Sequence, residues 1–230
     1  MNNGNHLKKG NDTKKRIINA AKQLFGTKTY DYVSTRMIAA EAKCSQSAIS
    51  FYFETKENLC RAVIDDIIYY HGLYYGPILK AVRNAEEAGT LTPELAMQLL
   101  QQYIQCHISI AFNEKNRCAI SFAINNQALP SELSGLITIS TMEKATRPMA
   151  RLLIAISDIS YAEALTYSQT MCSGIYSFPF LMPDISQEIR NGENESDEPE
   201  TNENEEARRL QVQQYILNFC MMQIRAIKKS

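Results

Sequence analysis

Three short segments within residues 33–59 place the tightest limits on how this chain can fold. Ser34 or Thr35 begins the first, Ser45 the second and Thr55 the third. Hydroxyl side chains favour helix N-caps because their oxygen accepts a hydrogen bond from a free backbone N–H group. Apolar residues follow each of them at helical spacing. The pattern predicts two short helices joined by a tight turn, with a further helix directly after them.

The rest of the chain also favours helices over strands. Its 230 residues include only 9 Gly and 7 Pro, so few residues interrupt regular structure. Near the N-terminus, one stripe at helical spacing predicts a helix from about residue 12, and Gly26 tolerates the left-handed conformation at its end. We therefore expect an all-α fold. The stripe consists of Ile17, Ile18, Ala21, Leu24 and Phe25.

Further helices are expected towards the C-terminus. Thr92-Pro93 combines a capping residue with a proline at the first helical position, and Ser160 with Glu163 matches a capping box. The last helix, at about 207–227, carries Leu210, Leu217 and Ile224 seven residues apart. The expected starts are Pro77, Thr92, Ser131 (running through Leu153), Ser160 (ending near Phe178-Pro179) and residue 207.

Charge is distributed unevenly along a chain whose net charge is only -1. Residues 1–70 hold 11 Lys and Arg against 7 Asp and Glu, a surplus of +4 that fits local contact with a polyanion. Residues 1–11 are expected to form a disordered basic arm. Residues 191–206 hold eight acidic and no basic residues, so self-repulsion predicts a disordered loop.

These patterns divide the chain into a basic arm at 1–11, a domain at 12–70 and a larger helical domain at 71–230. The six Cys have no CxxC spacing and only three His are present, so we expect no metal site and no cofactor. Scattered thiols, a polar N-terminus and the lack of a long apolar run favour a cytoplasmic protein with no membrane contact.

The helix pair at about 34–53 suits the DNA-binding helix-turn-helix, whose second helix enters the major groove. The second helix exposes short polar side chains that reach base edges or phosphates. Hydroxyl, guanidinium, phenol and ammonium groups around it are expected to bind phosphates. The predicted DNA-binding residues are Ser34, Thr35, Arg36, Ser45, Gln46, Ser47, Ser50, Tyr52 and Lys56. On an isolated helix, these side chains would more often form a merely solvated face.

The region resembles the tetracycline-repressor (TetR) family of bacterial regulators over about residues 12–64. The matching residues include Leu24-Phe25-Gly26, Ser34 to Ala39, Ile49 to Phe53, and Thr55 to Leu59. The chain departs from the family at Cys44, where Gly or Ala is common, and at Gln46-Ser47 and Ser50-Phe51. The resemblance implies a transcriptional regulator with a helix-turn-helix DNA-binding domain, followed by a larger helical domain for ligand binding and dimerisation.

The resemblance further implies a homodimeric repressor that binds double-stranded DNA at a palindromic operator. A small-molecule effector, expected to be largely apolar or aromatic, would bind in the second domain and move the fourth helix, at about 56–72. The last two long helices, about 160–180 and 207–227, would form the dimer interface. Heptad spacing and small side chains independently fit that role for Ser168, Gly174, Leu210, Leu217 and Ile224.

Effector-pocket residues follow less directly from the sequence. Tyr103, His107, Phe122 and Tyr176 are candidates for the cavity, although side chains of this kind more often pack in a core. His107 beside Cys106 is better explained as a core histidine than as a metal ligand. Tyrosines at 69, 70, 74 and 75 either line a ligand entrance or pack one domain against another.

Two other classes of function compete with a repressor. An enzyme is disfavoured because no phosphate-binding loop, GxSxG, HExxH or plausible nucleophile–base pair occurs. We therefore expect no catalytic residues. The alternative is a helical dimerisation or interaction protein that has lost or weakened its DNA binding, because no Lys or Arg lies between Ser45 and Thr55.

Overall fold

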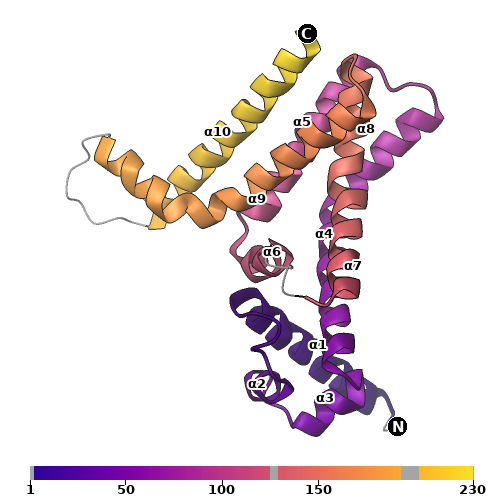
Figure 1. Cartoon of the computed structure of the whole chain (residues 1–230), viewed down its shortest axis with the longest axis vertical. Helices are drawn as coiled ribbons and strands as arrows, with labels where there is room; N and C mark the ends of the chain where they lie inside the picture. Colours follow the sequence, from indigo (N-terminus) through magenta and orange to yellow (C-terminus); the bar gives the residue numbers. More distant parts are fainter. Residues whose placement is uncertain (1–2, 125–128, 193–201, 230) are drawn as a thin grey trace. The chain divides into compact units, whose positions relative to one another are not determined.

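The computed structural model describes residues 3–124, 129–192 and 202–229, and the regular elements in these ranges are all helices (Figure 1). The expectation of an all-α fold is therefore confirmed. The chain forms two compact units, one made of residues 1–72 and 115–141 and the other of residues 73–114 and 142–230. The sequence divided the chain at residue 70 alone, and so placed residues 115–141 in the C-terminal domain.

The first unit contains the helix-turn-helix region and a pair of helices from the middle of the chain. Its elements are α1 (Asn3–Thr27), α2 (Thr35–Glu41), α3 (Gln46–Phe53), the first part of α4 (Lys56–Glu87), α6 (Arg117–Ile124) and α7 (Ser131–Thr141). The helix α1 begins at Asn3, whereas residues 1–11 were expected to be a disordered arm. The helix therefore extends past the apolar stripe and through Gly4 and Gly10, two poor helix formers.

One hydrophobic core holds the first unit together. Ile17 of α1, Ile38 of α2, Ile49 of α3 and Leu59 of α4 are all 2% exposed or less. The segment 115–141 joins this unit because Phe122 of α6 enters the same core, with its ring centroid 5.8 Å from that of Phe25. Burying large side chains of this kind contributes about 1.5–3 kcal/mol each.

The second unit contains the rest of α4 and four long helical segments. These are α5 (Pro93–Ala111), α8 (Arg147–Ile156), α9 (Tyr161–Gly192) and α10 (Asn202–Lys229), with a short helix at Met142–Thr146. A 3-10 turn at Glu114–Asn116 lies at the boundary between the two units. Two predicted N-termini are confirmed. Thr92 Oγ1 accepts a hydrogen bond from Leu95 N at 3.2 Å. Ser160 and Glu163 bond reciprocally, at 2.8 Å and 3.3 Å.

Several predicted helix ends were wrong. Pro77 lies inside α4 rather than opening a helix, and α9 continues past Phe178-Pro179 to Gly192. Buried residues on both sides of Pro77, Tyr75 and Val82, keep the helix packed despite the lost backbone hydrogen bond. The helix predicted from Ser131 through Leu153 is interrupted by a π-helical turn at Met142–Thr146.

The acidic stretch at 191–206 is only partly described. Residues 191–192 end α9, residues 202–206 begin α10, and residues 193–201 lie outside the described part of the chain. The expectation of a disordered loop therefore falls mainly on residues that the structure does not describe. Among the described helices, none is long and apolar enough to cross a membrane.

Candidate nucleic-acid interface

The turn between α2 and α3 is built from two capped helices. Ser34 Oγ accepts a hydrogen bond from Met37 N, and Ser45 Oγ accepts one from Ala48 N, each at 3.2 Å. Between them, Lys43 adopts a left-handed conformation with a φ of 51°, which reverses the chain direction. The sequence prediction of two short helices joined by a tight turn is confirmed.

Helix α3 has one buried and one exposed face. Ile49 and Phe53 are 2% and 5% exposed, so they attach the helix to the core of the first unit. Gln46, Ser47 and Ser50 are exposed, as the sequence predicts for a recognition helix. The anchoring side chains fix which face of α3 remains available for a partner.

Hydrogen bonds connect the polar residues at the start of α3. Gln46 Nε2 donates to Thr35 Oγ1 of α2 at 3.2 Å, and the hydroxyl oxygens of Ser45 and Ser47 are 2.8 Å apart. Four of the predicted DNA-binding residues therefore form two hydrogen-bonded pairs in the free protein. The bond between Gln46 and Thr35 also holds the exposed ends of α2 and α3 in a defined relation.

Lys56, at the first position of α4, is held by Tyr30. Its Nζ donates to the Tyr30 carbonyl oxygen at 2.6 Å and lies 4.0 Å from the centre of the Tyr30 ring. The Tyr30 hydroxyl donates to Glu57 Oε1 at 3.1 Å. Burial and the nearby Glu57 raise the pKa of Tyr30. The pKa of Glu57 is lowered by hydrogen bonds from the backbone N–H of Glu57 and from the Tyr30 hydroxyl. An ammonium group has three N–H donors, so the bond to Tyr30 leaves Lys56 able to bind a phosphate.

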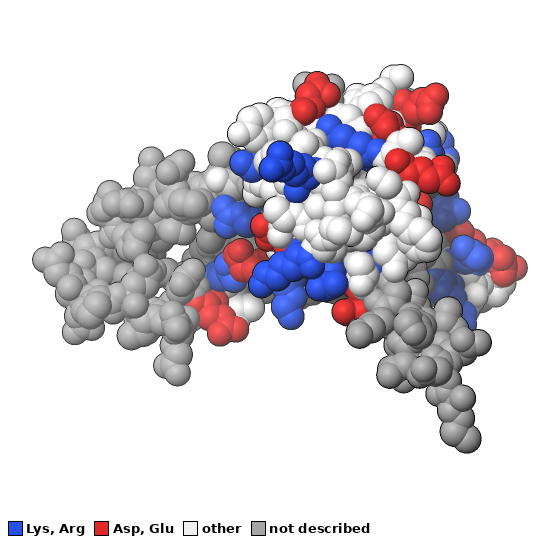
Figure 2. Space-filling model, turned by 90° about the horizontal axis from the view of Figure 1, so that it is seen from below, with Lys and Arg blue, Asp and Glu red and all other residues white. Residues whose placement is uncertain are grey.

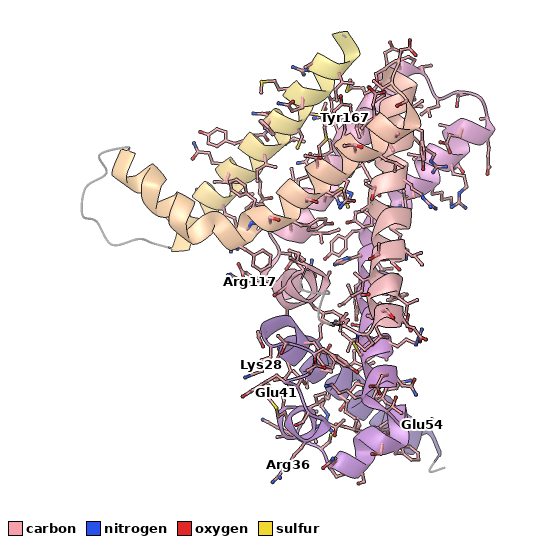
Figure 3. The ribbon with its side chains drawn as sticks, in the orientation of Figure 1. Lys28, Arg36, Glu41, Glu54, Arg117 and Tyr167 are labelled. Atoms are coloured by element: carbon pink, nitrogen blue, oxygen red, sulfur yellow. The ribbon has the colours of Figure 1, made fainter. Side chains whose placement is uncertain are left out.

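Helix α3 itself contains no charged residue. Arg36 is exposed and points outward from α2, while Tyr52 is half-buried (Figure 3). Figure 2, which views the molecule from below, shows an uncharged area with Lys and Arg side chains at its edges and Asp and Glu side chains among them. Sequence reasoning missed one exposed residue of α3, because Phe51 is 80% exposed. The sequence prediction selected polar side chains as DNA contacts, so the apolar Phe51 was passed over. Only the packing of Ile49 and Phe53 into the core shows that Phe51 faces outward.

The predicted effector-pocket residues are only partly brought together. In the second unit, His107 Nδ1 lies 2.9 Å from the Tyr176 hydroxyl and 3.1 Å from that of Tyr75, and the two hydroxyls are hydrogen-bonded. Tyr103 packs edge-on to His107, with ring centroids 4.7 Å apart. Phe122 does not join them, because it lies in the core of the first unit.

This aromatic cluster comes from α4, α5 and α9, and Tyr176 is its one half-buried member. Tyr75 is 2% exposed, and Tyr103 and His107 are fully buried. Burial is the main cause that raises the pKa of Tyr75, Tyr103 and Tyr176. All three phenols are therefore neutral hydrogen-bonding groups. Within the described residues, no group of three His, Cys, Asp or Glu side chains is arranged to hold a metal ion.

The residues predicted for the dimer interface fall into different environments. Leu217 and Ile224 are buried because this face of α10 packs within its own unit, where α10 contacts α5. Ser168 is also buried, and its hydroxyl donates to the Ala164 carbonyl oxygen at 2.7 Å. Only Leu210, at 59%, and Gly174 are exposed. Two of the three heptad residues, Leu217 and Ile224, therefore lie on the face of α10 that packs within its own unit.

A groove of about 900 Å³ runs between α9 and α10 on the other face of these helices. Tyr167 and Gly174 line it from α9, and Tyr215 and Phe219 line it from α10. Figure 3 labels Tyr167 on α9. Tyr215 and Phe219 are 57% and 58% exposed, so large apolar surface remains open along this face.

One comparison with known proteins, the family model, points to a family. The family model described as "Bacterial regulatory proteins, tetR family" matches residues 17–63, which include α2, α3 and the start of α4. Among solved structures, a transcriptional regulator (TerR/AcrR family) from Aquifex aeolicus VF5 is 18% identical, with a TM-score of 0.45 over 78% of this chain and 96% of that chain. A search of curated protein sequences finds no match.

Proposed function

We infer that this chain, which belongs to the TetR family of bacterial regulatory proteins, is a homodimeric repressor of a palindromic operator that a small-molecule effector releases. It is a transcriptional regulator with a helix-turn-helix DNA-binding domain. The observation that carries the proposal is the exposed polar face of α3, fixed by the buried Ile49 and Phe53 and bordered by Arg36 and Lys56.

In the proposed complex, α3 enters the major groove and the flanking groups bind phosphates. The exposed Gln46, Ser47 and Ser50 would contact base edges, with Ser34, Thr35 and Ser45 at the two helix starts. Arg36, Tyr52 and Lys56 would bind backbone phosphates, which fixes the position of α3 without reading sequence. Because α3 carries no Lys or Arg, sequence choice would depend on neutral contacts and on DNA shape.

The apolar groove between α9 and α10 supports a homodimer. Two copies related by a two-fold axis would bring the same groove together, as in the commonest closed assemblies. Tyr167, Tyr215 and Phe219 are the exposed aromatic side chains that such contact would bury. Two recognition helices in one dimer would then match the two halves of a palindrome.

The aromatic cluster in the second unit supports effector control. It includes Tyr75 of α4, and the same continuous helix begins at Lys56 in the DNA-binding unit. An effector that displaces Tyr75, His107 or Tyr176 would shift α4 and change the separation of the two α3 helices. Such coupling is typically about 1–3 kcal/mol. The effector would have an aromatic or apolar body and at least one hydrogen-bonding group.

DNA from upstream of the protein's own gene tests operator binding. In a gel-shift titration at physiological salt, we expect a specific complex and a footprint with two-fold symmetry. Arg36→Ala should weaken it, whereas Arg83→Ala should not, because Arg83 is exposed on α4 in the second unit. A wild-type protein that binds this DNA no better than random DNA contradicts repression of its own gene. A dimer without any DNA affinity would instead support the interaction-protein alternative.

The dimer interface is tested by sedimentation of two matched variants. Phe219→Asp places a charge in the groove and should give a monomer with weaker operator binding. Met222 is almost equally exposed, at 57%, on the same helix but does not line the groove, so Met222→Asp should remain dimeric. A dimeric Phe219→Asp protein would disprove this interface.

Effector release is tested by adding a library of aromatic and other largely apolar small molecules to the operator complex. A true effector should release wild-type protein from DNA and release Tyr176→Phe with altered affinity, because that variant loses the hydroxyl bonded to His107. Equal release of both proteins by every active compound would place the effector elsewhere.

A further inference from the structure

We propose that Phe51 reads a thymine methyl group in the major groove and is a specificity-determining residue of this regulator. The inference rests on the proposed function, because it requires α3 to enter the major groove. It adds an apolar contact to the polar side chains that the sequence identified.

The position of Phe51 is unusual for its residue type. It is 80% exposed, the largest fraction among the exposed large apolar side chains in the described residues. Its neighbours on α3, Ile49 and Phe53, are 2% and 5% exposed. Single apolar side chains on a protein surface are common. Phe51 differs in lying on the helix face that the core leaves free for DNA.

The ring of Phe51 is supported from one side. It packs edge-on to the Tyr52 ring, with centroids 5.1 Å apart and an angle of 81° between the planes. Tyr52 is itself half-buried against the core of the first unit. A supported aromatic ring loses little conformational freedom on binding, so contact with a small apolar group is favourable.

The remaining side chains on this face are poorly suited to strong discrimination on their own. Gln46 bonds to Thr35, and Ser47 bonds to Ser45. No Arg is present on α3 to recognise guanine. In the major groove, thymine presents a methyl group at C5, and apolar side chains contact it. Thymine therefore provides the base feature that matches the most exposed side chain of α3.

The direct test removes the methyl group from the DNA. The full chain selects its operator from a randomised duplex library, and each thymine is then replaced by uracil in turn. Wild-type affinity should fall about fourfold at the contacted position in each half-site, as expected for one lost apolar carbon. Phe51→Ala should bind the thymine operator more weakly than wild type and should not distinguish thymine from uracil there.

Matched controls separate this contact from general effects. Tyr69→Ala removes another exposed aromatic ring, 63% exposed on α4, and should keep the wild-type response to uracil. Because Phe51 is exposed, Phe51→Ala should retain the wild-type thermal transition. Loss of affinity in Phe51→Ala with no uracil effect in wild type would overturn the proposal in favour of a contact to the DNA backbone.

Failure of the proposed function gives a different result. If the wild-type chain selects no sequence from the library, both DNA recognition and the role of Phe51 are disproved. If it selects an operator but binds every uracil-substituted version equally well, only the role of Phe51 is disproved. A uracil effect that persists in Phe51→Ala would assign the methyl contact to another residue.

Discussion

Lys56 shows how one side chain can serve both the fold and a partner. Its ammonium group bonds the Tyr30 carbonyl oxygen and lies over the Tyr30 ring, which ties the segment before α2 to the start of α4. In the proposed complex, the same group binds a phosphate. The structural contact positions Lys56 in advance, so little side-chain freedom is lost when DNA binds.

Removing this charge should change the salt dependence of DNA binding. We expect Lys56→Ala to weaken operator and random DNA alike and to lower the log–log salt slope by about 1. Titrations at several salt concentrations measure the slope. Lys80→Ala, an exposed lysine on α4 in the second unit, is the control and should leave the slope unchanged. An unaltered slope in Lys56→Ala would disprove the phosphate contact.

Glu54 carries backbone strain directly after the recognition helix. Its φ of 62° and ψ of -56° form a tight turn in which Thr55 N donates to the Phe53 carbonyl oxygen at 2.7 Å. Residues other than glycine rarely adopt this conformation, which typically costs about 1–3 kcal/mol. Glu54 lies at the end of α3 (Figure 3). The strain therefore fixes where α3 ends and α4 begins.

Two substitutions at Glu54 separate strain from charge. Both Glu54→Gly and Glu54→Ala remove the carboxylate, but only glycine adopts a positive φ freely. We expect the glycine variant to unfold in urea with a free energy about 1 kcal/mol higher than that of the alanine variant. Equal stabilities would show that the turn relaxes without strain.

At the scale of elements, Gly26 allows α1 and α6 to approach closely. A Cβ atom at this position would lie 2.9 Å from the Cα and carbonyl carbon of Cys118, the second residue of α6. Ser121 Oγ also donates to the Gly26 carbonyl oxygen at 2.6 Å. Gly26 lies within α1 and has no positive φ, so the sequence expectation of a left-handed helix end was wrong.

A methyl group at Gly26 should force the two helices apart. We expect Gly26→Ala to lower the free energy of unfolding by about 1–3 kcal/mol, because backbone atoms have little room to shift. Gly135→Ala is the control within the same unit, since an added Cβ there meets nothing within 4 Å. That variant should be more stable by about 0.5–1 kcal/mol. Equal effects of the two substitutions would contradict the close approach.

At the scale of the whole molecule, buried cysteine thiols should make the free energy of unfolding depend on pH. Cys60, Cys172 and Cys220 are at most 3% exposed, and all six cysteines are free. Burial is the main cause that raises the pKa of Cys60 and Cys172 to about 12 and that of Cys220 to about 11. In the unfolded chain, these thiols ionise near their ordinary value of about 8.5.

Their contribution to stability should be fully present below about pH 8.5 and should decline as the pH rises towards 11. The unfolded state loses protons in this range while the folded state keeps them, so ionisation favours unfolding. Each thiol lowers the free energy of unfolding by at most about 1.4 kcal/mol per pH unit. Urea denaturation from pH 7 to 11 measures the decline, which should be shallower in Cys172→Ala. An identical pH dependence in that variant would exclude the thiol as a cause.

The sequence by itself determined the local features of this protein. Ser34, Ser45, Thr92 and Ser160 cap helices because each side chain bonds a backbone group three residues away, and no distant residue is needed. The family pattern is likewise confined to one stretch, residues 17–63. The helix-turn-helix and its exposed polar residues were therefore predictable.

Only the tertiary structure decided features that depend on residues far apart in the chain. Pro77 and Pro179 end no helix. At Pro77, the buried Tyr75 and Val82 pack the turns on both sides and outweigh the lost backbone hydrogen bond. Leu217 and Ile224 face inward because α5 covers that side of α10. Phe51 faces outward because Ile49 and Phe53 occupy the core. The spacing of apolar residues in a helix shows which of them share a face. Which helix packs against that face depends on residues elsewhere in the chain.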